Sequence, residues 1–203
     1  TASNLSFDAL ASSGSEFFLA LGDMSYGAPG TEETWCNIVK ARVGSSYPFE
    51  LVTGNHEDDG GSNGFINNFA ACLPDRLNST GVYGFEYYFD YKGLARIIMI
   101  SPNMKVNGTS HSYSVGKPGY VWLSARIDEA RAAGIPWVIV GMHRKCIGMG
   151  GSCNIGSTGL MELLIAKRVD LVLQAHQHNY QRSKQLTCVY AGTYNPACVV
   201  DDG

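Results

Sequence analysis

The fold is decided by residues 119–141, which read GYVWLSARIDEARAAGIPWVIVG. From Val121 to Ala130, apolar residues recur at the three- and four-residue spacing of one helical face, and Gly134 supplies the glycine that commonly ends a helix. The run over 136–141 is apolar on both faces, as in a strand that helices cover on both sides of a sheet. This stretch therefore predicts a helix followed by a buried strand.

The alternation of helices and strands continues on both sides of this stretch. A helix is predicted over 158–168 and another buried strand over 169–173. Aromatic alternation over 83–91 and the β-branched run over 94–100, joined by Tyr91-Lys92-Gly93, predict an antiparallel hairpin, which makes the sheet mixed. Further strands are predicted at 16–21 and 49–53, and further helices at 31–43, with Thr31 as N-cap, and at 65–72. Since no repeat and no linker is visible, we predict one α/β domain over residues 1–203.

The composition excludes several classes of protein. The 203 residues are 45% apolar and 16% charged, with a net charge of −3, which is typical of a globular domain. No Lys/Arg cluster runs longer than Arg144-Lys145, so nucleic acid is not expected as a standing partner. The longest apolar stretches are only as long as strands, so no membrane span is expected.

Cysteines and sequons point to a secreted protein. The six cysteines include no C-x-x-C pair, which argues against a structural zinc or thioredoxin-type motif. Fifteen pairings are formally possible, and buried free thiols are the alternative. Proximity along the chain favours three disulfides: Cys146–Cys153, Cys188–Cys198 and, from the remaining two, Cys36–Cys72. Together with sequons at Asn4, Asn78 and Asn107, these disulfides fit an oxidising, secretory route.

Polar side chains follow four of the predicted strands. They are Asp23 and Tyr26, Asn55 and His56, His143, and His176 and His178. In an open α/β sheet, ligand-binding groups collect beyond the carboxyl ends of the strands. Oxygen donors mixed with imidazoles suit first-row transition metals, and a phenolate from Tyr26 would favour Fe(III). A carboxylate that bridges two cations about 3.5–4 Å apart clamps a phosphate, so we expect a two-metal phosphoester hydrolase.

Four motifs carry a family resemblance. They read Gly22-Asp23-Met24-Ser25-Tyr26, Gly54-Asn55-His56-Glu57, Val140-Gly141-Met142-His143 and Ala175-His176-Gln177-His178. In order and in wide spacing they resemble the G-D-x-x-Y, G-N-H-[DE], V-x-x-H and G-H-x-H motifs of the calcineurin-like metallophosphoesterase superfamily. Tyr26, followed by Gly27-Ala28-Pro29, is similar to the purple acid phosphatase group within it and not to the protein phosphatase branch.

The resemblance implies a fold and a set of roles. The fold would be an αββα sandwich of two mixed β-sheets flanked by helices. Asp23 would bridge two metals; Tyr26 and His178 would complete an Fe(III) site, and Asn55, His143 and His176 would hold a divalent Fe, Zn or Mn. His56 would contact the phosphate or help to protonate the leaving group. A metal-bound hydroxide would then hydrolyse phosphate monoesters, as in a secreted acid phosphatase acting on a small phosphorylated substrate.

The sequence departs from the family pattern in two ways. The D-x-G motif that would precede Asp23 is not found, because Asp8 is followed by Ala9-Leu10. Either the N-terminal strand that carries this aspartate is missing, or the first metal site lacks a ligand. We expect the former, a chain that is incomplete at both ends, without its first strand and its C-terminal strands. Plant-type members also carry histidines shortly after the V-x-x-H motif, but residues 144–159 contain none. Arg144, Lys145 or the backbone amides of residues 148–151 are expected to hold phosphate instead.

Other interpretations stay open at this point. The same scaffold would also suit a phosphodiesterase or nucleotide hydrolase, or a non-catalytic secreted fragment that keeps the fold. Asp23 and Asn55 could serve as turn residues and Tyr26 as a packing residue. His111 lies outside the motifs and is expected to be structural, residues 57–59 to form a solvated acidic turn, and the aromatic run over 85–89 to fill the core of the hairpin.

Overall fold

The strands form one mixed sheet and two separate strand pairs. The computed structural model describes residues 2–149, 152–189 and 195–201, with side chains from Leu5 onward. The five-stranded sheet has the order β3-β4-β5-β6-β7 (Thr80–Val82, Glu86–Tyr91, Ala95–Ile100, Trp137–Met142 and Leu171–Gln174). Strands β3, β4 and β5 pair antiparallel, whereas β5, β6 and β7 pair parallel. The pairs are parallel β1 (Phe18–Ala20) with β2 (Phe49–Leu51), and antiparallel β8 (Gln185–Leu186) with β9 (Val199–Asp201).

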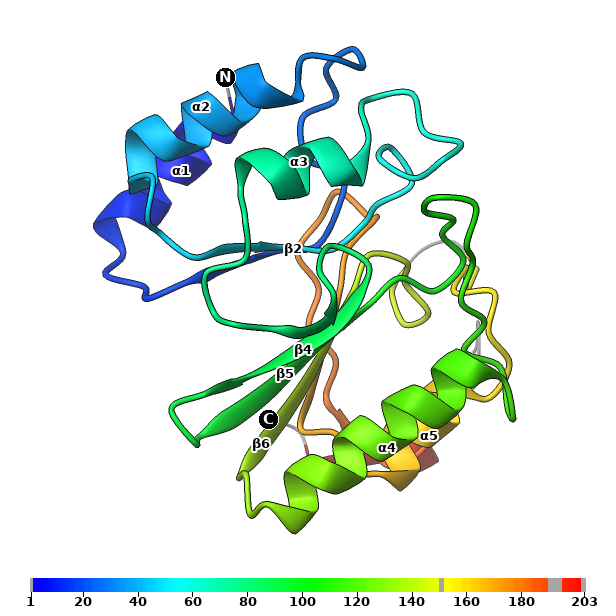
Figure 1. Ribbon diagram of the computed structural model, residues 1–203. Helices are drawn as coiled ribbons and strands as arrows, with labels where there is room; N and C mark the ends of the chain where they lie inside the picture. The colour runs from blue at the N-terminus through cyan, green and yellow to red at the C-terminus, as the bar shows by residue number, and fades with distance from the viewer. Residues whose placement is uncertain (1, 150–151, 190–194, 202–203) are drawn as a thin grey trace.

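Helices lie on both sides of these strands. Figure 1 shows α2 and α3 on one side of the five-stranded sheet and α4 and α5 on the other. The helices are α1 (Ala2–Ser12), α2 (Glu32–Val43), α3 (Ile66–Cys72), α4 (Pro118–Ala132) and α5 (Leu160–Ala166), with a 3₁₀ turn over Pro196–Cys198. A helix connects each parallel pair: α2 joins β1 to β2, α4 joins β5 to β6, and α5 joins β6 to β7. The carboxyl ends of the strands within each parallel pair therefore lie at the same edge of the sheet.

Two hydrophobic clusters hold the helices against the strands. Ile98, Val140 and Met142 of the sheet pack with Leu123 and Ile127 of α4 and with α5. On the other side, Phe49 and Leu51 of β2 pack with residues of α1, α2 and α3, such as Phe7, Val39 and Phe69. Between the two sheets, Ile97 and Met99 of β5 pack with Val52, which follows β2. Because both faces are covered, β5 and β6 are apolar almost throughout.

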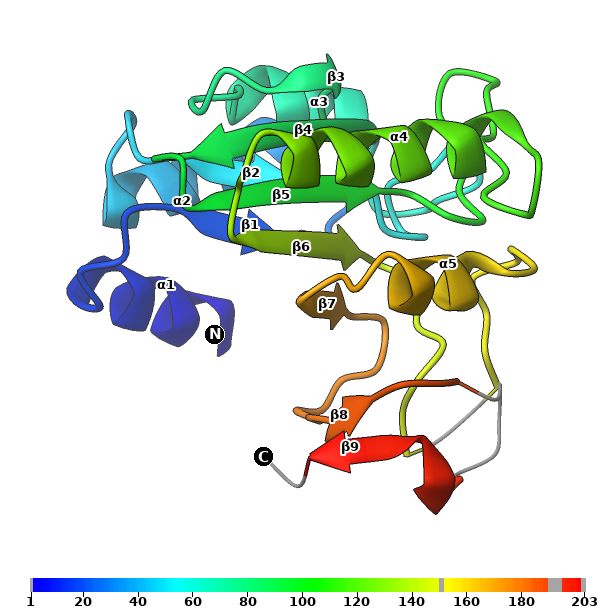
Figure 2. The same ribbon diagram turned by 90° about the horizontal axis from the view of Figure 1, so that it is seen from below.

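The predicted α/β fold is confirmed, with differences in detail. The hairpin forms as predicted, with Lys92 and Gly93 at positive φ in its turn, and Phe85, Tyr87 and Phe89 are buried. The sheet of β1 and β2, in contrast, is parallel among the described residues and not mixed as expected. Helix α1 and the pair β8–β9, which lies apart from the five-stranded sheet in Figure 2, were not predicted.

The expected disulfide pairing is confirmed. Cys36 pairs with Cys72, Cys146 with Cys153, and Cys188 with Cys198.

Of the sequon asparagines, Asn78 and Asn107 are exposed, whereas the side chain of Asn4 lies outside the described part of the structure. Among the described helices, none combines the length and the apolar character that crossing a lipid bilayer requires.

Candidate metal centre

The ends of β1 and β2 approach each other at two glycines. A Cβ atom on Gly22 would lie 2.6 Å from the Cα of Gly54, and a Cβ atom on Gly54 would lie 2.3 Å from the backbone nitrogen of Asp23. Cβ atoms do not pack at such distances, so only glycine fits at either position without a shift of the backbone. The close approach places Asp23 of one strand end beside Asn55 and His56 of the other.

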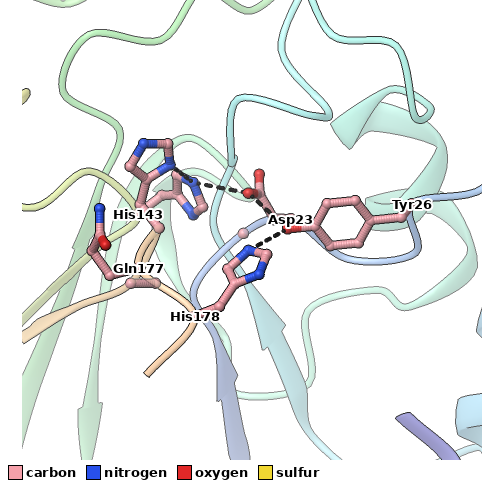
Figure 3. Close-up of a pocket in the computed structure, with 8 residues that line it drawn as sticks. Asp23, Tyr26, His143, Gln177 and His178 are labelled. Carbon is pink, nitrogen blue, oxygen red and sulfur yellow. Dashed lines mark hydrogen bonds and ion pairs between the residues drawn. The ribbon is translucent and has the colours of Figure 1, made fainter. Parts of the chain in front are cut away.

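Asp23 lies at the centre of the gathered side chains. It has a left-handed backbone, with φ of 53°. Its Oδ1 accepts the backbone N–H of His56 at 3.1 Å, and its Oδ2 accepts the Tyr26 hydroxyl at 3.2 Å and lies 3.3 Å from Nε2 of His143. Figure 3 shows Asp23 between His143 and Tyr26. Burial raises the pKa of Asp23, but the contacts with His143 and His56 in their protonated forms and with the backbone N–H of His56 outweigh it and lower the pKa to about 2.

Glu57 is buried, which corrects the prediction of a solvated acidic turn. Its side chain is 1% exposed. Its carboxylate accepts the backbone N–H of Asp23 at 2.9 Å, that of Gly54 at 3.1 Å, and that of Met24. Burial raises the pKa of Glu57, and these three N–H contacts oppose that rise. Glu57 thus joins the two strand ends and holds Asp23 in its left-handed conformation. Asp58 is half-buried and Asp59 exposed, nearer to the prediction.

His143, at the end of β6, presents a lone pair to the site. Its Nδ1 lies 2.7 Å from the carbonyl oxygen of Leu21, which can only accept, so Nδ1 carries the proton. In the neutral ring Nε2 then has no proton, yet it faces Oδ2 of Asp23 at 3.3 Å and Oδ1 of Asn55 at 3.1 Å. Three lone-pair donors that face one another repel, and a cation between them relieves the repulsion. This donor set fits a metal ion.

His176 completes a group of three metal-type side chains. Its Nδ1 lies 3.2 Å from Nε2 of His143, and one potential ligand atom from each of Asp23, His143 and His176 lies within 4.8 Å of the others. Burial lowers the pKa of His176, and the neighbouring His143 and Arg144 lower it further. His176 is therefore neutral near pH 7, the form that binds metals.

Tyr26 and His178 form the opposite side of the pocket. The Tyr26 hydroxyl lies 3.0 Å from Nε2 of His178 as well as 3.2 Å from Asp23 (Figure 3). Burial, followed by the charge of Asp23, raises the pKa of Tyr26 to about 12. The phenol therefore loses its proton only to a strongly acidic cation. The ring of His56 lies against Tyr26 with its centroid 4.5 Å away, and Nε2 of His56 is 3.9 Å from Oδ2 of Asp23.

Of the two side chains predicted to bind phosphate, one reaches the site and the other is buried. Arg144 reaches the site, with Nη1 at 3.3 Å from Nε2 of His176. Lys145 is only 3% exposed, and its backbone N–H donates to Asn154. In the 148–151 loop, Gly150 and Gly151 lie outside the described residues. His111 pairs with Glu86 at 3.0 Å, in keeping with its expected structural role.

Sequence reasoning missed three polar side chains that fix this site. Glu57 is the first. Gln174 accepts the backbone N–H groups of Cys146 and Ile147, which ties the loop after His143 to the end of β7. Asn63 contacts the ring of His56 at 2.6 Å. The motif Gly54-Asn55-His56-Glu57 marks the position of Glu57 but not its contacts, and no sequence spacing signals Gln174 or Asn63, because their contacts depend on how loops meet in space.

Comparison with known proteins identifies the class. The chain belongs to the calcineurin-like phosphoesterase family, whose sequence model matches residues 5–180. The solved structure of purple acid phosphatase PPD1 from yellow lupin (Lupinus luteus) seeds has the same fold, with a TM-score of 0.60 and 16% identity over 87% of this chain and 33% of that one. The fold of this family implies a binuclear metal centre, and the gathered donors fit it.

Relatives by sequence are longer than this chain. An uncharacterized protein of Mycobacterium tuberculosis is 30% identical over 84% of this chain and 35% of its own length. Purple acid phosphatase 21 of Arabidopsis thaliana is 25% identical over 84% of this chain and 39% of its own length. Nucleotide pyrophosphatase/phosphodiesterase of Hordeum vulgare is 26% identical over 90% of this chain and 55% of its own length. The chain thus spans from about a third to about half of these relatives.

Proposed function

We propose that the protein is a metal-dependent phosphoester hydrolase that acts on phosphate monoesters in the manner of an acid phosphatase. The observation that carries this proposal is the convergence of Asp23, His143 and His176 within 4.8 Å at the carboxyl ends of strands far apart in the sequence. Membership of the calcineurin-like phosphoesterase family and similarity to purple acid phosphatases support the same reaction class.

Two neighbouring metal sites account for all six gathered side chains. Asp23, whose Oδ2 lies near both the Tyr26 hydroxyl and Nε2 of His143, would serve both sites. Tyr26 and His178 would hold Fe(III) on one side, and Asn55, His143 and His176 would hold a divalent Fe, Zn or Mn on the other. When bound, the two ions supply Lewis acidity to the phosphoryl group and lower the pKa of water at the site.

The protein's own residues orient the substrate. Arg144 presents a guanidinium at the rim, which binds phosphate oxygens through paired N–H donors. Nε2 of His56 lies 3.9 Å from Oδ2 of Asp23, and the imidazolium form of His56 would donate its Nε2 proton to the leaving group or a hydrogen bond to the phosphate. Asp23 is ionised over the working pH range because of its low pKa.

A phosphodiesterase or nucleotide hydrolase is the second candidate. The printed name of the Hordeum vulgare relative favours it, since that protein is a nucleotide pyrophosphatase/phosphodiesterase. Rates on p-nitrophenyl phosphate, bis-p-nitrophenyl phosphate and a nucleoside diphosphate separate the two candidates. A monoesterase hydrolyses the first substrate fastest, and a faster rate on the diester or the diphosphate would favour the second candidate.

Metal analysis with matched histidine variants tests the proposal. His176→Ala and Asn55→Ala are expected to lower metal content and to abolish hydrolysis, whereas His111→Ala, a histidine paired with Glu86 outside the site, is expected to change neither. A visible charge-transfer band that disappears in Tyr26→Phe would support Fe(III) at the tyrosine side. Full activity in His176→Ala would contradict the assignment.

Secretion is also part of the proposal. The three disulfides and the exposed sequon asparagines Asn78 and Asn107 support an oxidising compartment. Glycan at these two positions, read from the mass before and after glycosidase treatment, is the expected result. An unglycosylated, fully reduced protein recovered from its source would contradict it.

A further inference from the structure

Asn63 lies at the end of the loop between β2 and α3 and contacts His56 twice. Its backbone N–H donates to the carbonyl oxygen of His56 at 3.0 Å, and its Oδ1 lies 2.6 Å from Nδ1 of the same residue. The loop passes directly over His56, because a Cβ atom on Gly61 would lie 2.4 Å from the carbonyl oxygen of His56. The chain thus folds back so that residue 63 faces residue 56.

The remaining contacts of Asn63 fix which way its amide points. Nδ2 lies 3.0 Å from the carbonyl oxygen of Gly27, which can only accept, so the amide nitrogen faces Gly27. The amide oxygen must then face His56, where it also accepts the Ser62 hydroxyl at 3.2 Å. Since an amide oxygen can only accept, Nδ1 of His56 carries the proton.

This assignment determines what His56 offers to the pocket. With one proton held on Nδ1 by Asn63, the nitrogen left for the reaction is Nε2, 3.9 Å from Oδ2 of Asp23. The proton that passes to the leaving group is then the second proton of the imidazolium form, carried on Nε2, and its loss leaves the neutral ring with Nδ1–H. The same amide binds the carbonyl oxygen of Gly27, the residue after Tyr26. It therefore connects the segments that carry Tyr26 and His56, whose rings are in tilted contact with centroids 4.5 Å apart. The far side of the loop is anchored too, because Asp59 accepts the N–H groups of Asn107 and Gly108 at 2.9 and 2.7 Å.

We propose that Asn63 is a positioning residue for the hydrolysis reaction, which sets the tautomer and ring orientation of His56 so that Nε2 meets the phosphate or its leaving group. This inference rests on the proposed function. Partners that orient metal-ligating histidines through the other ring nitrogen typically contribute about 10- to 100-fold to metal affinity or activity, and we expect an effect of this order for the partner of His56.

The first test reads the histidine ring itself and needs no turnover. Long-range ¹H–¹⁵N spectra of protein with added Zn²⁺ show which ring nitrogen of each histidine bears the proton. Comparison with His56→Gln assigns the signals of His56. The expected result is an Nδ1–H ring in the wild type that is lost in Asn63→Ala and kept in Asn67→Ala, which removes a surface asparagine that contacts only Asn107 among the described contacts. An Nδ1–H signal unchanged in Asn63→Ala would overturn the proposal.

The second test separates positioning from a merely structural role. Asn63→Ala is expected to lower kcat by about 10-fold or more on an alkyl phosphate and by less on p-nitrophenyl phosphate, whose leaving group needs no proton. In a His56→Ala background, Asn63→Ala should not lower kcat any further. The variant Asn63→Asp, which keeps an acceptor for Nδ1–H of His56, should retain most of the wild-type kcat. Equal losses in both backgrounds would overturn the proposal. Inactivity of every variant and of the wild type would instead contradict the proposed function, while the ring spectra still decide the role of Asn63.

Discussion

At the scale of single residues, the site depends on a glycine where no side chain fits. Gly54 is buried, and a Cβ atom there would lie 2.3 Å from both the nitrogen and Oδ1 of Asp23. Gly54→Ala is therefore expected to push the strand ends apart, to lower the unfolding free energy by about 1–3 kcal/mol and to lower metal content. Urea unfolding and elemental analysis measure the two effects. Gly60→Ala is the control, because its nearest neighbour would lie 3.5 Å away. Equal stability of the two variants would contradict the steric explanation.

Glu57 gives a second prediction at this scale. Glu57→Ala leaves the backbone N–H groups of Asp23, Met24 and Gly54 without their acceptor. An unsatisfied buried group costs about 1–3 kcal/mol, so the variant is expected to lose about 3 kcal/mol or more of unfolding free energy. Asp58→Ala, which removes a single contact to the N–H of Gly60, is expected to lose less than about 1 kcal/mol. A loss no larger than in Asp58→Ala would show that Glu57 does not hold the strand ends.

At the scale of elements, strand β2 carries a buried carboxyl that makes stability depend on pH. Glu50 is fully buried, with Oε1 accepting the N–H of Arg76 at 3.2 Å and Oε2 without a hydrogen-bond partner among the described residues. Burial raises the pKa of Glu50 from 4.5 to about 7. Below pH 4.5 the carboxyl is neutral in both the folded and the unfolded chain, so Glu50 does not make the unfolding free energy depend on pH there. Between pH 4.5 and 7 only the unfolded chain releases the proton, so the unfolding free energy falls as pH rises.

The variant Glu50→Gln is expected to remove this dependence. The loss in the wild type is complete above about pH 7 and amounts to about 3 kcal/mol, at about 1.4 kcal/mol for each pH unit. Glu50→Gln should therefore gain stability relative to the wild type as pH rises from 4.5 to 7, measured by urea unfolding at each pH. Glu33→Gln, on the exposed face of α2, should show no such trend. If the difference in unfolding free energy between Glu50→Gln and the wild type stayed constant from pH 4.5 to 7, the pKa assigned to Glu50 would be contradicted.

At the scale of the whole molecule, the disulfides differ in the length of chain that they close. Cys36–Cys72 joins α2 to α3 across 36 residues, whereas Cys188–Cys198 closes only 10. Chain-entropy arguments assign about 4 kcal/mol to the first and about 3 kcal/mol to the second. The double variant Cys36→Ala/Cys72→Ala is therefore expected to unfold at lower urea than Cys188→Ala/Cys198→Ala. The reverse order would show that strain or local packing outweighs loop closure.

The parts of the fold that the sequence predicted are those with a clear local pattern. Residues 119–141 were predicted as a helix and a strand, and α4 and β6 form there, because helical spacing and a short apolar run are properties of neighbouring residues. Helix α1 was missed because its segment is rich in small polar residues. Phe7, the buried residue of this helix, packs against the rings of Trp35 and Phe49, which lie far along the chain. The sequence around Phe7 does not show these contacts.

The candidate site also has parts that the sequence predicted and parts that it did not. Asp23, His143 and His176 lie together as predicted. His143 and His176 follow β6 and β7, whose carboxyl ends meet at one edge, whereas Asp23 follows β1 of the separate pair and is held beside them by the contact between His143 and the carbonyl oxygen of Leu21. Their roles as ligands stay a prediction. Glu57 was predicted to be exposed, because three converging N–H groups cannot be seen from the sequence. The role proposed for Asn63 depends on its contacts with His56 and Gly27, which the loop brings together.

The contact between Tyr26 and His178 joins residues 152 positions apart. Closing so long a stretch of chain is slow in comparison with forming a neighbouring helix and strand, so we expect this contact to form late in folding. During synthesis, moreover, His178 leaves the ribosome long after Asp23. We therefore expect a colour or a metal signal that needs both Tyr26 and His178 to appear only after residue 178 has been synthesised.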